Sequence, residues 1–100
     1  MNLENFKADI EVRLNSIAEF ELLEFHYQPY SFGSGLVVYR INGRIHKFVY
    51  DGRDNILTWL ISKEHQKYIT ADLSEYCSFK GLFIDNDELS KGIKSTLQCG

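Results

Sequence analysis

The first stretch of the chain has the apolar pattern of an amphipathic helix. Its large apolar residues recur at spacings of three and four: Leu3, Phe6, Ile10, Leu14 and Ile17. That spacing places them on one face of an α-helix. We therefore predict a helix over residues 2–18, with Asn2 as its N-cap.

The pattern then changes to the alternation that is typical of β-strands. Residues 20–28 alternate between apolar and polar side chains, which predicts a half-buried strand that Pro29 ends. Two β-rich runs then flank Asn42-Gly43, the strongest short-range signal for a two-residue hairpin. That turn sets a register in which one face pairs Ile41 with Arg44, Tyr39 with His46, and Val37 with Phe48.

This hairpin is apolar on both faces, although a small domain has a single core. One face is aromatic and also carries Arg44 and His46. The other face is aliphatic: Leu36, Val38, Ile45 and Val49. We slightly favour the aromatic face as the core, which would leave the aliphatic set exposed. In the alternative, the aromatic and basic face is a binding patch of the kind found at protein interfaces.

The rest of the chain is less regular. Residues 56–61 fit either a strand or one face of a helix, and a short apolar run after the turn at 51–55 favours the strand. Residues 72–79 predict a short helix, although 76–79 are equally strand-like. Residues 85–97 predict a helix capped by Asp87 or Asn86. The whole chain, 1–100, is thus predicted to be one α+β domain with an N-terminal helix, a four-stranded antiparallel meander and C-terminal helices.

Composition places the chain among cytoplasmic globular proteins. Its 100 residues are 44% hydrophobic and 25% charged, which are ordinary values for one globular domain. No signal-peptide pattern and no apolar run of about 18 residues is present, so we expect no membrane association. Two cysteines are too few for a disulfide framework, which favours a reduced compartment.

The charge distribution favours a basic protein as the partner. The net charge of −3 argues against nucleic acid as the main ligand. Residues 1–24 carry six acids and two basic residues, a balance of −4, whereas residues 25–68 carry a balance of +3. An acidic surface around a mildly basic sheet is what electrostatic complementarity to a basic partner would require.

Reactive residues do not stand at the spacings that catalysis or metal binding needs. Ser34 lies between two glycines, but Phe32 breaks the G-x-S-x-G pattern of a nucleophile elbow. His26, His46 and His65 are about twenty residues apart, unlike the close spacings of most metal sites. We therefore predict no enzymatic activity, no metal and no cofactor.

Binding residues are accordingly predicted among acidic residues, the aromatic and basic residues of the hairpin, and Trp59. The predicted set is Glu19, Glu21, Glu24, Tyr39, Arg44, His46, Trp59, Asp85, Asp87 and Glu88.

Two resemblances give these predictions a context. The segment YRINGRIHKFVYDGRDNILTWLISKEHQKY, residues 39–68, resembles the C-terminal sheet of RelE-type ribosome-dependent endoribonuclease toxins, which would implicate His65, Lys67 and Arg44. The whole chain is similar in style to small acidic immunity proteins that neutralise bacterial polymorphic or contact-dependent toxins. That second resemblance implies a protein-binding inhibitor that occludes a basic toxin. The RelE-like enzyme is the alternative, and a homodimeric structural domain is another.

Overall fold

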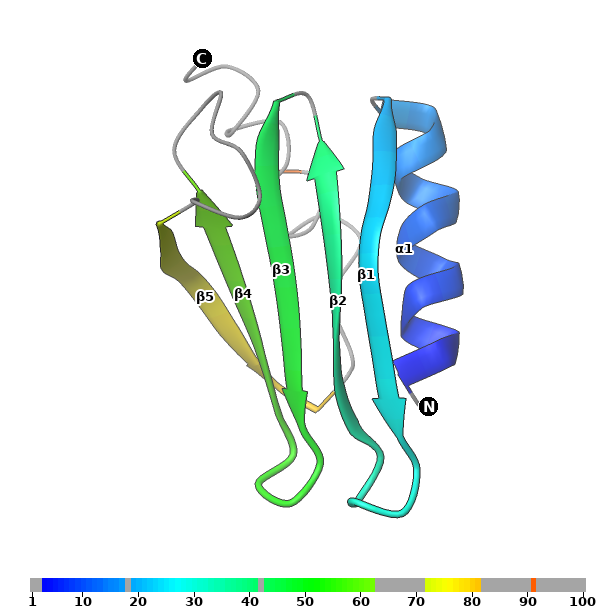
Figure 1. The fold of residues 1–100 in the computed structure, drawn as a ribbon, viewed down its shortest axis with the longest axis vertical. Coiled ribbons are helices and arrows are strands. Elements are labelled where there is room, and N and C mark those ends of the chain that lie inside the picture. The colour runs from blue at the N-terminus through cyan, green and yellow to red at the C-terminus, as the bar shows by residue number, and fades with distance from the viewer. Residues whose placement is uncertain (1–2, 18, 42, 63–71, 82–90, 92–100) are drawn as a thin grey trace.

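The computed structural model describes residues 3–17, 19–41, 43–62, 72–81 and 91, and in them one helix precedes a five-stranded antiparallel sheet (Figure 1). The elements are α1 (Leu3–Ile17), β1 (Phe20–Gln28), β2 (Ser34–Ile41), β3 (Arg44–Asp51), β4 (Ile56–Ser62) and β5 (Leu73–Lys80). The strand order β1-β2-β3-β4-β5 follows the sequence. Each strand therefore pairs with the next one along the chain, as in a meander.

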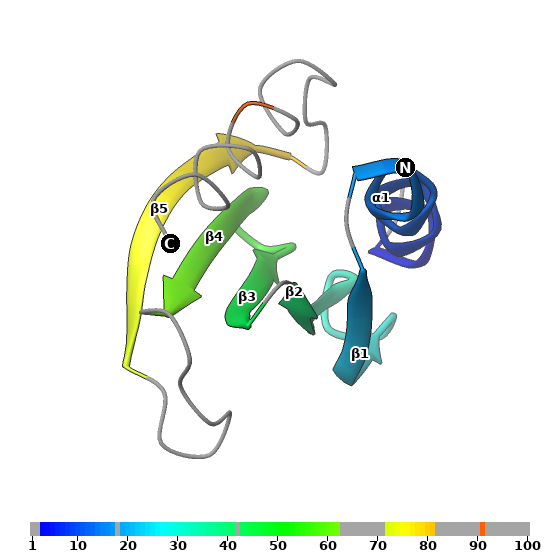
Figure 2. The same ribbon diagram turned by 90° about the horizontal axis from the view of Figure 1, so that it is seen from above.

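Helix α1 confirms the N-terminal prediction and provides one wall of the core. Leu3, Phe6, Ile10 and Leu14 are all buried, as their helical spacing requires. The helix contacts β1 and β2 and lies on the inner side of the curved sheet (Figure 2). We call the sheet face toward α1 the inner face and the opposite one the outer face. No helix in the described part of the chain is long and apolar enough to cross a membrane.

The central hairpin has the register that the sequence predicts. Ile41 lies opposite Arg44, and Tyr39 lies opposite His46. Gly43 has a φ of +86°, a backbone conformation that glycine adopts without steric cost. The strand assignment for residues 56–61 is also confirmed, because β4 pairs with β3 along its length.

The prediction for the C-terminal part of the fold, a four-stranded meander followed by helices, is wrong. Residues 72–79 were predicted as a short helix, but β5 occupies this segment and adds a fifth strand to the sheet. Cys77 and Phe79 lie opposite Trp59 and Leu57 and pack against the core. Pairing with the open edge of β4 thus decides a segment whose local pattern was ambiguous. The helix predicted over 85–97 lies outside the described residues, apart from Lys91.

The aromatic face of the hairpin is the core, as favoured from the sequence. Tyr39, Phe48 and Trp59 are fully buried on the inner face. The aliphatic face differs from expectation, because Val38 and Ile45 are also fully buried. Their cross-strand neighbours are Lys47 and Arg40, whose aliphatic stems can cover apolar atoms while their charges stay in water.

Candidate functional site

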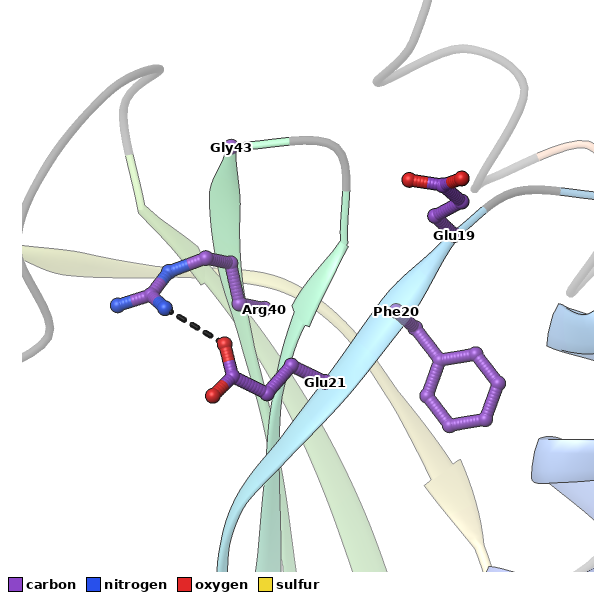
Figure 3. A pocket seen from close by; sticks show the side chains of 5 residues that line it. All are labelled: Glu19, Phe20, Glu21, Arg40 and Gly43. Atoms are coloured by element: carbon purple, nitrogen blue, oxygen red, sulfur yellow. Dashed lines mark hydrogen bonds and ion pairs between the residues drawn. The ribbon is translucent and has the colours of Figure 1, made fainter.

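The start of β1 borders a hollow of about 270 Å³. Glu19, Phe20, Glu21, Arg40 and Gly43 line it (Figure 3). Alternation along the strand turns Phe20 away from its two acidic neighbours, as Figure 3 shows. The ring of Phe20 packs edge-on against Tyr39, with 5.7 Å between ring centroids. The apolar side chain thus anchors the strand, and the carboxylates stay at the surface.

Arg40 holds one of these carboxylates in place. Glu21 and Arg40 are cross-strand partners in the register of β1 and β2. Arg40 Nη1 donates to Glu21 Oε2 over 2.8 Å. Because both side chains are well exposed, the pair contributes little to folding stability. Its main effect is to orient Glu21 at the rim of the hollow.

A β-bulge places Glu24 on the same face of β1 as Glu21. The register between β1 and β2 shifts between Leu22 and Glu24, so that Glu21 lies opposite Arg40 and Glu24 lies opposite Val38. Without the bulge, positions 21 and 24 would point to opposite faces of the strand. With it, both lie on the outer face. We call Glu19, Glu21 and Glu24 the acidic strip.

Glu24, at the C-terminal end of the acidic strip, contacts a histidine. The Nε2 atom of His26 lies 2.6 Å from Glu24 Oε1, and the imidazole is largely exposed. Beyond it, a second hollow of about 490 Å³ is lined by residues of β1, β2 and β3: His26, Gln28, Ser34, Gly35, Leu36, Val49, Tyr50 and Asp51. The strip therefore runs between two surface hollows along an edge strand.

The two aromatic residues of the predicted binding set, Tyr39 on β2 and Trp59 on β4, lie in the core instead of at the surface. Tyr39 and Trp59 have no exposed surface. The Tyr39 hydroxyl donates to Glu11 Oε2 at 2.9 Å, and the Trp59 ring stacks on Phe48 at 5.1 Å between centroids. In this conformation neither ring is accessible to a partner.

His46 and Arg44 occupy neighbouring inner-face positions on β3. Trp59 Nε1 donates to His46 Nδ1 at 3.2 Å, and His46 is fully buried. Burial, helped by the charge of Arg44, lowers the pKa of His46 to about 4. The imidazole is therefore neutral at physiological pH. Arg44 is half-buried at the start of the strand.

The other predicted residues fall outside the part of the chain that the structure describes. These are the acids Asp85, Asp87 and Glu88, together with His65 and Lys67 of the RelE-like interpretation. Within the described residues, no group of three or more His, Cys, Asp or Glu side chains is placed to hold a metal ion.

Sequence reasoning missed two exposed aromatics in the loop between β1 and β2. Tyr30 is fully exposed and Phe32 is largely exposed. Phe32 also has a φ of +61°, which is unusual for a bulky residue. The flanking Pro29 and Gly33 marked this segment as a loop but gave no signal for the orientation of the rings. The role of Arg40 in holding Glu21 was also missed, because it depends on strand register.

Comparison with known proteins finds no match: no family model, no curated protein and no solved structure is significantly similar to this chain.

Proposed function

We propose that this protein binds another protein through the acidic strip on β1. The observation that carries the proposal is the alignment of Glu21 and Glu24 on the outer face of an edge strand, with Glu19 just before that strand. Glu19 and Glu21 also line the hollow beside it. In the described sheet β1 pairs only with β2, so it is an edge strand of that sheet. A concave surface with oriented carboxylates suits lysine and arginine side chains of a partner.

The partner that fits this surface is basic. The carboxylates of the acidic strip belong to the segment 1–24, which has a charge balance of −4 from six acids and two basic residues. The negative electrostatic field of these charges increases the rate of association with a cationic protein. We propose a basic toxin domain, with this chain acting in the cytoplasm as an immunity protein that occludes the toxin's active site.

Inhibition would follow from steric exclusion and charge pairing, without a chemical step. Arg40 orients Glu21 before the partner arrives, which reduces the side-chain entropy that binding would otherwise lose. Glu19 forms no ion pair among the described residues and is exposed. It is free to pair with a cation of the partner.

The test measures association with candidate toxin domains encoded by genes next to this one. Stopped-flow binding at low and high salt would compare the wild type with Glu19→Lys. We expect the association rate to fall about tenfold at low salt, and its salt dependence to weaken, because the steering charge is reversed.

The matched control is Glu75→Lys on β5, the opposite edge of the sheet. It makes the same change in net charge at another exposed position. Equal association rates for the two variants would show that only net charge matters and would contradict the proposed site. Co-expression with the toxin supplies the functional readout, since wild type should restore growth and Glu19→Lys should restore it less.

A further inference from the structure

Two buried nitrogen donors lie next to each other on the inner face of β3. Arg44 Nε and His46 Nε2 are both buried, and neither has a hydrogen-bond acceptor within the described residues. Positions two apart on a strand point to the same face and are separated by about 7 Å. Leaving a buried donor unsatisfied costs about 1–3 kcal/mol, so folded proteins usually supply an acceptor.

The contact with Trp59 determines which ring nitrogen of His46 carries the proton. An indole nitrogen can only donate, so the 3.2 Å contact from Trp59 Nε1 makes His46 Nδ1 the acceptor. The neutral ring must then carry its proton on Nε2. The buried Nε2 atom is thus a donor, as Arg44 Nε always is.

Arg44 adds a fixed positive charge beside that donor. Its charge is close enough to lower the pKa of His46. In the described part of the chain, no acidic residue forms an ion pair with Arg44. Arg44 is only half-buried and begins β3, so part of this residue is in contact with solvent.

A third buried donor, Arg13 Nη1, belongs to a guanidinium that already has an acidic partner. The Nη2 atom of that guanidinium donates to Asp9 Oδ2 at 2.9 Å on the same helix. Its charge is therefore already neutralised. Among the described residues, the charge of Arg44 has no such counter-ion, and the two buried donors of Arg44 and His46 have no acceptor.

We propose that Arg44 and His46 form a binding site for an oxyanion, in which one oxygen accepts from Arg44 Nε and another accepts from His46 Nε2. Carboxylate and phosphate groups both have two or more oxygens for such a pair of donors. The site lies on the inner face and has the opposite polarity to the acidic strip. The proposal of this oxyanion site does not depend on the proposal of a protein partner.

The test uses Trp59 as the reporter, because it is the only tryptophan in the chain and donates directly to His46. The indole N–H and the His46 ring signals would be followed by NMR at pH 7 during titration with inorganic phosphate, with acetate, and with chloride at matched ionic strength. We expect saturable shifts with phosphate, acetate or both, and none with chloride. A response to phosphate alone assigns a phosphate group, and a response to acetate alone assigns a carboxylate.

Variants separate this site from general anion effects. Arg44→Gln should weaken binding of the responding anion at least tenfold. Arg53→Gln, which removes an exposed arginine from the turn after β3, should bind like wild type. Should Arg44→Gln fail to fold, Arg44→Lys keeps the charge but removes Nε and should still weaken binding. Absence of a saturable shift with both anions, or unchanged binding in the Arg44 variant, would overturn the proposal.

Discussion

The hydroxyl of Tyr39 on β2 donates to the carboxylate of Glu11 on α1 at 2.9 Å. Lys7 lies 2.7 Å from the same carboxylate oxygen. This is a polar link between the helix and the sheet beside their apolar contact. Burial, together with Glu11, raises the pKa of Tyr39 well above its usual value, so the phenol stays protonated and remains a donor.

Removing this link should destabilise the domain. Tyr39→Phe keeps the ring and deletes the donor, and we expect a loss of about 1–2 kcal/mol, because hydrogen bonds to charged groups are stronger than neutral ones. Urea denaturation at pH 7 measures it. The fully exposed Tyr30 provides the control, since Tyr30→Phe should change stability by less than about 0.5 kcal/mol. Equal effects of the two substitutions would mean that the Glu11 contact contributes nothing.

Stability should fall in acid because of His46. Its pKa of about 4 in the folded protein lies below the ordinary value of 6.5, so the unfolded chain binds the extra proton first. The stabilisation is therefore complete above about pH 6.5 and is lost as the pH falls to about 4, amounting to about 3 kcal/mol. Urea melts at pH 7 and pH 4.5 would compare wild type with His46→Gln, whose loss on acidification should be smaller. His26→Gln, at an exposed histidine, should behave like wild type. An unchanged acid response in His46→Gln would refute this assignment.

Gly35 permits a close approach between two strands and the helix. A Cβ atom there would collide with the carbonyl oxygen of His26 and would lie 2.7 Å from Leu3 Cδ2. Because the His26 carbonyl is backbone, Gly35→Ala should cost at least about 2 kcal/mol. At Gly33 the nearest atom to an added Cβ is 3.9 Å away, so Gly33→Ala should cost only the roughly 1 kcal/mol of its positive φ. Thermal denaturation of both variants checks the order, and a smaller loss at Gly35 than at Gly33 would contradict the packing argument.

Phe32 should be replaceable with a gain in stability. Its side chain is largely exposed, so little burial is lost on replacement, while its φ of +61° favours asparagine over a bulky residue. We expect Phe32→Asn to raise the free energy of unfolding by about 0.5–1 kcal/mol. Tyr30→Asn in the same loop, at a residue without a positive φ, should not. Destabilisation by Phe32→Asn in urea melts would instead show that the ring packs in solution.

Local patterns in the chain were enough to predict α1 and the central hairpin. The spacing of Leu3, Phe6, Ile10 and Leu14 specifies α1, because a helix repeats every 3.6 residues whatever it packs against. Asn42-Gly43 sets the register of β2 and β3, because a two-residue turn leaves no freedom in the pairing. The same register placed Tyr39 and His46 on one face, which allowed that face to be favoured as the core.

Features that depend on residues far apart in the chain follow from the folded sheet and not from local patterns. Residues 73–80 became a strand because β4 offered an unpaired edge, whereas their local pattern suited a helix equally well. The bulge that aligns Glu21 with Glu24, and the bond from Trp59 that assigns the proton of His46, likewise arise between separate strands. Backbone pairing and burial are properties of the assembled sheet, and a single segment of sequence does not carry the positions of its neighbours.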